Sequence, residues 1–248
     1  MTGSSRFHWL RTVVYLIPAV TLYTIVLGTI SVASSLFDRS GDFGHRCARL
    51  WSSLILKTTG VRVDVHGLDH LDPTRTYVFA SNHQSIYDIP ILFASLPFQL
   101  RIVAKASLGR IPFLGWHLGR TGHLLVDRSK PGAGVVKKMA KLVGARHSLI
   151  VFPEGTRSLD GTVARFKGGS FVLAVDTHLP IVPVSVAGSR HVMTKGQLTV
   201  RPGHVSVTVH APVATDTAAR NGVRVLADQV REVVRREVDE PATDVTAP

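Results

Sequence analysis

An uncharged stretch near the amino end constrains the fold of this chain more than any other feature. It runs from Thr12 to Phe37, 26 residues bounded by Arg11 and Asp38. A membrane-spanning helix needs about 20 apolar residues. A cleaved signal peptide has a shorter apolar core, although residues 31–33 weakly resemble a cleavage site. The stretch therefore predicts a helix that crosses a membrane or enters one leaflet, with burial in a soluble core as the alternative.

A second helix is predicted directly after this stretch. Its apolar residues recur at helical spacing, and they are Phe43, Cys47, Leu50, Trp51, Leu54 and Ile55. Basic residues occupy other parts of the wheel, so the helix can lie in a headgroup interface or pack on the protein core. We interpret the two helices, residues 1–60, as a membrane-anchoring hairpin. Arginines flank the apolar stretch on both sides, so the positive-inside rule discriminates its orientation poorly.

The charge balance predicts an anionic partner. The chain has 29 Lys and Arg against 17 Asp and Glu, which gives a net charge of +12. Zinc-finger spacing and RNA-binding signatures are absent, and the basic residues alternate with apolar ones. These patterns favour an anionic membrane surface over nucleic acid. Cys47 is the only cysteine, which excludes an internal disulfide and a thiolate metal site. We expect it to be a small buried apolar residue.

Beyond Val61, short apolar runs alternate with helical patterns. The runs suit buried strands, and they occupy residues 61–65, 76–80, 101–104, 123–126, 148–152, 181–186 and 204–210. Amphipathic helices are predicted between and after them, at residues 135–143 and 223–238. This alternation predicts an α/β domain, residues 61–238, with a mixed, mostly parallel sheet flanked by helices. The tail, residues 239–248, is expected to be disordered.

A histidine and a carboxylate lie five positions apart in the segment Ser81 to Asp88, which reads SNHQSIYD. Within one helix His83 and Asp88 would point about 140° apart. They can pair if His83 lies in the loop after a strand and Asp88 in the first turn of the next helix, where Pro90 is tolerated. Asp88 then orients an imidazole that can take a proton from a hydroxyl. Taken alone, the pair is weak evidence for catalysis, and a structural role is the favoured interpretation.

A second polar segment follows the strand at residues 148–152. Pro153 ends the ladder, and Glu154 to Arg157 follow at the carboxyl end of the strand, where open α/β sheets place ligands. Arg157 can bind a phosphate bidentately, and Glu154 can hold a substrate hydroxyl or orient a cation. A solvated turn with a surface ion pair is the alternative. No G-x-S-x-G elbow is present, so a hydroxyl of the substrate would be the nucleophile.

Taken together, the motifs resemble the glycerolipid acyltransferase family, the 1-acylglycerol-3-phosphate acyltransferases of the plsC type. The resemblance covers roughly residues 60–211. Asn82-His83 with Asp88 matches the N-H-x4-D motif, and residues 152–158 match the E-G-T-R-S acceptor block. The other matching positions are Lys105, Leu108, Pro112 and Gly115, then Gly122 with Asp127-Arg128, Phe166-Lys167-Gly168, and Val182-Pro183-Val184.

This resemblance implies a membrane-bound acyltransferase. His83, oriented by Asp88, would deprotonate the free sn-2 hydroxyl of lysophosphatidic acid. The oxygen would attack the thioester of acyl-CoA or acyl-carrier protein and give phosphatidic acid without an acyl-enzyme. Another lysophospholipid, a lyso-aminolipid or a glycolipid is the alternative acceptor. A non-catalytic membrane lipid-binding protein is the remote alternative.

The resemblance also implies the substrate-binding residues, which are Glu154, Gly155, Thr156, Arg157, Lys105 and Arg128. Among them the three cations are expected to hold the acceptor phosphate. Three other arginines are expected to line a basic, membrane-facing surface, namely Arg101, Arg110 and Arg120. No metal and no other cofactor is expected. We expect the enzyme at the cell membrane, with its catalytic domain on the cytoplasmic side.

Overall fold

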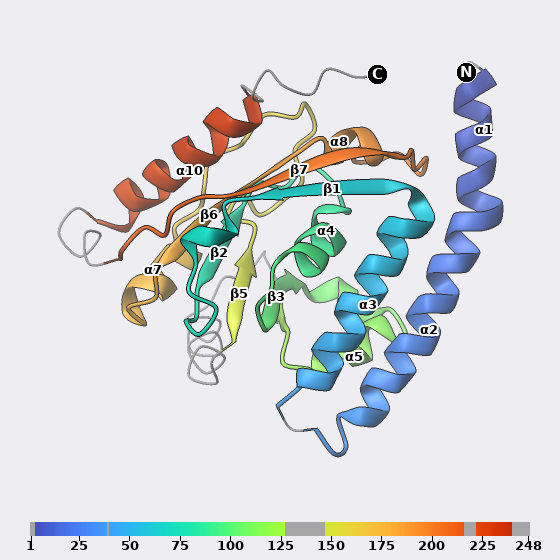
Figure 1. Cartoon of the computed structure of the whole chain (residues 1–248), viewed down its shortest axis with the longest axis horizontal. Helices are drawn as coiled ribbons and strands as arrows, with labels where there is room; N and C mark the ends of the chain where they lie inside the picture. Colours follow the sequence, from blue (N-terminus) through green and yellow to red (C-terminus); the bar gives the residue numbers. More distant parts are fainter. Residues whose placement is uncertain (1–2, 39, 127–146, 216–221, 240–248) are drawn as a thin grey trace.

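A seven-stranded sheet forms the centre of the molecule (Figure 1). The computed structural model describes residues 3–38, 40–126, 147–215 and 222–239. The strand order is β1-β7-β6-β2-β5-β3-β4. The strands are β1 Val61–His66, β2 Val78–Ser81, β3 Leu100–Lys105, β4 Leu124–Val126, β5 Ser148–Val151, β6 Ile181–Ala187 and β7 Gly203–Val209. Each matches a strand that the apolar runs predict, to within a few residues.

The described sheet is mixed and mostly parallel, as the sequence predicts. Its neighbouring strands are parallel, with the exception of the antiparallel pair β6 and β7. The carboxyl ends of β2, β5 and β3 therefore meet at one edge of the sheet. The two polar segments follow β2 and β5, and Lys105 is the last residue of β3.

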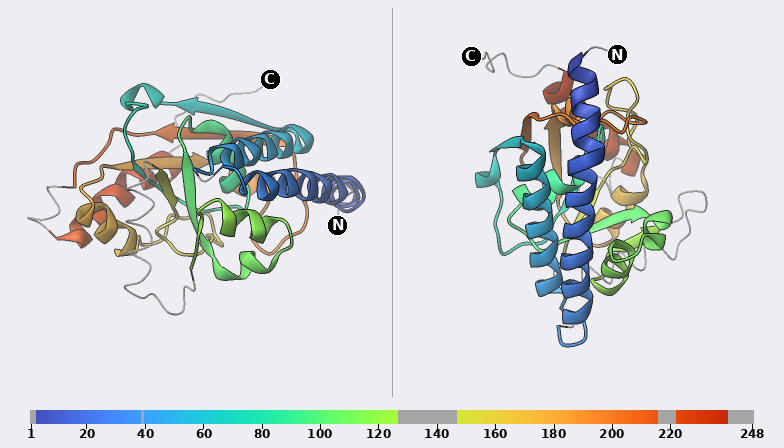
Figure 2. Two further views of the ribbon diagram at one scale, coloured as in Figure 1. Left: turned by 90° about the horizontal axis from the view of Figure 1, so that it is seen from below. Right: turned by 90° about the vertical axis from the view of Figure 1, so that its right-hand side faces the viewer.

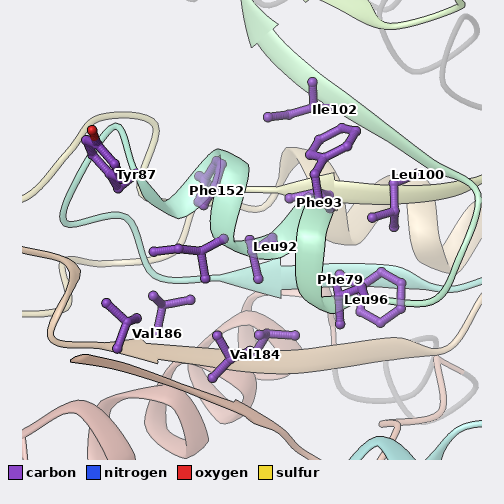
Figure 3. Close-up of a cluster of buried hydrophobic side chains, with 14 of the residues drawn as sticks. Phe79, Tyr87, Leu92, Phe93, Leu96, Leu100, Ile102, Phe152, Val184 and Val186 are labelled. Carbon is purple, nitrogen blue, oxygen red and sulfur yellow. The ribbon is translucent and has the colours of Figure 1, made fainter. Parts of the chain in front are cut away.

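Helices cover both faces of the sheet, and alternating side chains feed two hydrophobic cores. Phe79 points to the core that contains α4 (Asp88–Ser95), shown in Figure 3. Its neighbours Val78 and Ala80 point to the core that contains α7 (Gly169–Asp176) and α10 (Val223–Asp239). Strands that are buried on both faces read as continuous apolar runs rather than as alternating ones.

One continuous helix runs along the side of the molecule (Figure 2). It comprises α1 Gly3–Arg11, a π-helical turn Thr12–Leu16, and α2 Ile17–Ser34. Pro18 lacks an N–H, and its ring would collide with the carbonyl four residues earlier in a regular α-helix. The wider turn directly before it avoids that conflict. Within the described residues, Ser5–Ser34 is the one helix long and apolar enough to cross a membrane.

The membrane-anchoring role predicted for the second helix of the hairpin stays a prediction. Helix α3 (Asp42–Thr59) does lie beside α2, but its apolar face packs on the protein core, which was the alternative for this segment. Ile55 and Leu56 are buried in the α4 core. Trp51, expected in a headgroup interface, donates its indole N–H to Thr24 Oγ1 of α2 at 3.0 Å. The structure therefore shows one long apolar helix, and contact of α3 with lipid stays a prediction.

Arg101 departs from the surface position expected for it. Its side chain is 1% exposed and donates to the carbonyl of Ser40 and to His147 Nε2, both at 3.1 Å. Arg110 and Arg120, by contrast, are exposed as expected. A charged group in the second position of a buried strand was not foreseeable from the apolar pattern, because its partner carbonyl belongs to the distant turn between α2 and α3.

Three more histidines surround Arg101 in a buried cluster. Burial, followed by the positive charge of Arg101, lowers the pKa of His45 and of His117 to about 4. His123 lies beside His117, with ring centroids 5.4 Å apart, and its pKa is lowered for the same reasons. These imidazoles are therefore neutral at physiological pH, and Arg101 carries the charge of the cluster.

Two predicted segments lie outside the described residues, namely the helix at 135–143 and the tail from residue 240. The helix predicted at residues 223–238 is α10. Cys47 is buried in α3, as expected. The division of the chain into segments 1–60 and 61–238 stays a prediction.

Candidate active site

His83 and Asp88 pair in the way that the spacing predicts. His83 lies in the loop after β2, and Asp88 is the first residue of α4. The imidazole Nδ1–H donates to Asp88 Oδ2 at 2.8 Å. The same oxygen accepts the backbone N–H groups of Gln84 and Ser85, at 2.8 and 2.9 Å. Three donors converge on one oxygen, which marks Asp88 as a carboxylate acceptor and leaves Nε2 of His83 free to act as a base.

Glu154 connects the two polar segments. Its Oε1 accepts the backbone N–H of His83 at 2.7 Å, and its Oε2 accepts that of Ala164 at 3.0 Å. Burial, reinforced by the nearby charge of Asp88, raises the pKa of Glu154 to about 7 against these stabilising hydrogen bonds. Its expected contact with a substrate hydroxyl stays a prediction. The geometry gives it a positioning role, because both oxygens already hold the backbone.

The remaining sides of His83 are also held by the second segment. The ring of Phe152 stacks on the imidazole, with centroids 4.0 Å apart and planes 18° from parallel. The backbone N–H of Ser158 donates to the carbonyl of His83 at 2.8 Å. The histidine is therefore confined from its backbone, its Nδ1 and one ring face.

Asn82 fixes the same loop from the opposite direction. Its side-chain amide donates to the carbonyl of Val186 at 2.9 Å and accepts the backbone N–H of Val186 at 2.8 Å. This pair of bonds copies a step of a β-ladder onto strand β6. The asparagine of the N-H-x4-D motif thus ties the catalytic loop to the sheet.

Residues 152–158, which follow β5 and are predicted to bind the acceptor, form what we call the acceptor loop. This loop presents a cation and a hydroxyl at the same sheet edge as Lys105. Gly155 has φ +78°, a conformation that L side chains rarely adopt, so the turn requires glycine there. Thr156 is exposed and Arg157 is half-buried. Lys105 ends β3 with an exposed side chain. Arg128 lies outside the described residues. The binding roles of these residues stay predictions.

A cavity of about 140 Å³, partly open to solvent, lies next to the start of α4. Ile86 and Ile89 line it on either side of Asp88 in the sequence. Its walls come from α2, α3, α4, β3 and α5 (Leu114–Arg120), and almost all of the surface is apolar. His117 and His123 of the buried cluster also line it. The site thus combines a polar sheet edge with an apolar cavity.

No metal site is evident in the described ranges, since no three His, Cys, Asp or Glu side chains within them are grouped as metal ligands would be. The reasoning from sequence did not anticipate three residues of the site. The roles of Phe152 and Asn82 were hidden although both belong to recognised motifs. Lys195, which contacts the acceptor loop, belongs to no motif.

Comparison with known proteins gives the same picture. The sequence model of the family described as Acyltransferase matches residues 62–187. The chain is 36% identical over 183 residues to a chloroplastic 1-acyl-sn-glycerol-3-phosphate acyltransferase of Brassica napus, covering 72% of this chain and 53% of that protein. It is 33% identical over 189 residues to the alpha form from Mus musculus, covering 75% and 66%. The chain spans about half the length of the plant relatives.

A solved structure extends the similarity to nearly the whole chain. The crystal structure of PlsC, the 1-acyl-sn-glycerophosphate (LPA) acyltransferase of Thermotoga maritima, superposes with a TM-score of 0.86 at 27% identity. The match covers 98% of this chain and 100% of the other. The paired His83 and Asp88, the loop that follows β5 and the match over half of the sequence lead to one conclusion: this chain belongs to the acyltransferase family.

Proposed function

We propose that this chain transfers an acyl group from a thioester to the sn-2 hydroxyl of lysophosphatidic acid and so forms phosphatidic acid. The observation that carries the proposal is the catalytic pair locked against the acceptor loop, through Glu154, Phe152 and Ser158. The names of the relatives, 1-acyl-sn-glycerol-3-phosphate acyltransferases, support the choice of acceptor.

The proposed reaction proceeds by direct transfer. Nε2 of His83 removes the proton from the acceptor hydroxyl while Asp88 stabilises the resulting imidazolium. The oxygen attacks the thioester carbonyl, the tetrahedral intermediate collapses, and the thiol leaves with a proton from His83. No protein nucleophile takes part, so the acyl group is never bound covalently to the enzyme.

The cations beside the loop supply the affinity for phosphate. Arg157 offers a planar fork that matches a phosphate, and Lys105 offers a point charge from the end of β3. Arg128 is a further candidate from the sequence. A phosphate held at this edge of the sheet places the free hydroxyl of a glycerol backbone toward His83.

The apolar cavity is the proposed site for the acyl chain of the donor. It lies next to the start of α4, at Ile86, and continues between α2, α3 and α5. A thioester at its mouth would have its carbonyl near His83 and its chain removed from water. Whether the thiol carrier is coenzyme A or a carrier protein is decided outside this cavity.

The membrane is the proposed location of the enzyme. Leu22, Val26 and Ile30 recur every four residues on the outward face of α2, and each is at least 43% exposed. Ile86, Ile111 and Trp116 are further large apolar side chains that are exposed. We propose that these residues contact lipid in the cell membrane, with the catalytic domain on the cytoplasmic side and near anionic headgroups.

The function is tested with the purified full-length protein and a panel of acceptors. Lysophosphatidic acid, lysophosphatidylglycerol, lysophosphatidylethanolamine and a lyso-aminolipid are each offered with acyl-CoA and with acyl-carrier protein. We expect the highest kcat/KM for lysophosphatidic acid. His83→Ala should reduce it by about 100 to 10,000-fold, the usual effect of losing a general base.

Three results would contradict the proposal. A different preferred acceptor would replace lysophosphatidic acid as the substrate. Normal turnover by a folded His83→Ala variant would show that His83 is not the general base. A radiolabelled acyl group that stays covalently attached to the protein would exclude direct transfer.

A further inference from the structure

Lys195 reaches back to the acceptor loop from a distant part of the chain. It lies in a turn shortly after α8 (Ser189–Val192). Its Nζ donates to the backbone carbonyl of Arg157 at 2.7 Å and to Thr156 Oγ1 at 3.1 Å. These two bonds link residues 38 and 39 positions apart. Both oxygens that accept these hydrogen bonds belong to the E-G-T-R-S block, so the lysine holds the acceptor loop from a distant turn.

The turn that carries Lys195 is itself attached to the catalytic motif. Ser85, within the N-H-x4-D motif, donates its hydroxyl to the carbonyl of Met193 at 2.8 Å. Thr194 adds a bond to the carbonyl of Arg190 at 3.2 Å. Residues 193–195 therefore touch the histidine loop on one side and the acceptor loop on the other. Their geometry connects the two halves of the site.

The ammonium of Lys195 is bonded to the backbone of Arg157 and to the side chain of Thr156. A lysine has three N–H donors, and two of them are used on neighbouring atoms of the loop. The bond to the Arg157 carbonyl restrains the peptide plane that follows Arg157 and so stabilises the backbone that carries its side chain. Among the described residues no carboxylate pairs with Arg157 or Lys195. The two adjacent cations are therefore ready for an anion from outside the chain.

We propose that Lys195 is a positioning residue for the acceptor phosphate, acting through the loop that carries Arg157. The proposal rests on the proposed function, since it names a residue that serves the same reaction. It predicts that loss of Lys195 impairs the acceptor and spares the donor. A purely structural role would instead lower stability and affect both substrates alike.

Steady-state kinetics of the full-length protein tests this, with each substrate varied separately. Lys195→Met should raise the KM for lysophosphatidic acid by about 5 to 50-fold, the scale of a lost charge-assisted contact, and leave the donor KM within about twofold. Lys195→Arg should recover most of the loss, because a guanidinium can still donate to the same carbonyl. Arg62→Met is the matched control, since it removes one exposed positive charge on β1 and should change neither KM.

A double-mutant cycle asks whether Lys195 acts through Arg157. If it does, Arg157→Ala with Lys195→Met should cost little more than Arg157→Ala alone, because the second change removes support for a side chain that is already missing. Fully additive losses would overturn the positioning role. So would an equal rise in the donor KM, or an unchanged acceptor KM in Lys195→Met.

Binding without turnover separates this proposal from the proposed function. In a His83→Ala background, Lys195→Met should weaken the binding of lysophosphatidic acid to the protein by a similar factor, measured by calorimetry in detergent micelles. Unchanged binding would overturn the role of Lys195 even if the wild type proved to be a lysophosphatidic acid acyltransferase. Weakened binding together with an inactive wild type would overturn the proposed reaction and support Lys195.

Discussion

At the scale of single residues, His83, the proposed base, is held mainly by a segment far from it in the sequence. Asp88 orients the ring, but Phe152 supplies its stacked wall and Glu154 holds its backbone N–H, 71 residues away. Preorganisation of this kind lowers the cost of reaching a reactive geometry. It also means that the second motif serves the base as well as the acceptor.

The stacked wall yields the first prediction. Phe152→Leu keeps an apolar residue of similar size but removes the flat face, so the imidazole can turn away from its productive orientation. We expect kcat to fall by about 3 to 30-fold, within the range that loss of orientation costs. Phe152→Tyr keeps the ring and should retain most of the activity. A Leu variant with unchanged kcat would show that Asp88 alone is sufficient to orient the ring.

Part of the site could be predicted from sequence because its logic is local. The spacing of His83 and Asp88, with Pro90 after them, forces a loop followed by a helix start, and the structure has both. Phe152 and Lys195 could not be assigned roles, because a ring stack and a carbonyl contact depend on which loops meet across the sheet. The strand order that brings those loops together leaves no mark in local periodicity.

At the scale of elements, the strands could be predicted from the sequence, but the surroundings of the helices at the amino end could not. Buried strands announce themselves as short apolar runs, and all seven are found in the described sheet. Helix α3 has an amphipathic pattern that suits a lipid interface and a protein core equally well. In the structure this face packs against α4. The face of a helix is visible in sequence, but the partner of that face is not.

Gly28 of α2 has a packing role. A Cβ on Gly28 would meet Phe113 Cβ at 3.0 Å, and Phe113 itself has a strained φ of 62°. Gly28→Ala should therefore destabilise the protein despite the better helix propensity of alanine. Gly119→Ala, in a helix with open space at that position, should be neutral or stabilising by up to about 1 kcal/mol. Thermal unfolding in detergent measures both, and equal shifts would argue against close packing of α2 on Phe113.

The buried histidine cluster predicts acid sensitivity. The pKa of His45 and of His117 is about 4 in the folded state, against an ordinary value of 6.5. The unfolded chain therefore takes up protons first as the pH falls. Their stabilising contribution is complete above about pH 6.5 and is lost as the pH falls toward about 4. Each group reduces the free energy of unfolding by at most about 1.4 kcal/mol per pH unit in that window.

Two substitutions test this origin. His45→Leu should flatten the dependence of the melting temperature on pH between about 6.5 and 4. His204→Leu removes a histidine whose side chain is 58% exposed, and it should leave the dependence unchanged. An unaltered acid transition in His45→Leu would assign the sensitivity to other groups.

At the scale of the whole molecule, the long helix has one face for the protein and one for its surroundings. The inward face closes the apolar cavity with Thr24, Leu27 and Gly28. The outward face is apolar and exposed, as a surface in contact with lipid would be. The proposed anchoring and the proposed chain binding therefore involve the same element, which makes them hard to separate by deletion.

Charge substitutions can separate them. Leu22→Lys with Val26→Lys should move much of the protein from the membrane pellet to the soluble fraction, because a charge in the bilayer centre costs several kcal/mol. Its melting temperature in detergent should stay near that of the wild type. Deletion of residues 1–60 should instead cause aggregation, because Ile55 and Leu56 leave the core. A lysine variant that stays wholly in the pellet would contradict the assignment of the outward face.

The bond between Thr12 and Val200 joins two residues that are synthesised at very different times. Thr12 Oγ1 accepts the backbone N–H of Val200 at 3.0 Å, 188 residues later in the chain. At roughly 5–20 residues per second, the helix emerges from the ribosome about 10 to 40 s before its partner exists. Strand β1 likewise cannot pair with β7 until β7 has been synthesised. The apolar helix must therefore be protected by a chaperone or a bilayer throughout that interval. The rest of the described fold then packs onto a helix that has already formed.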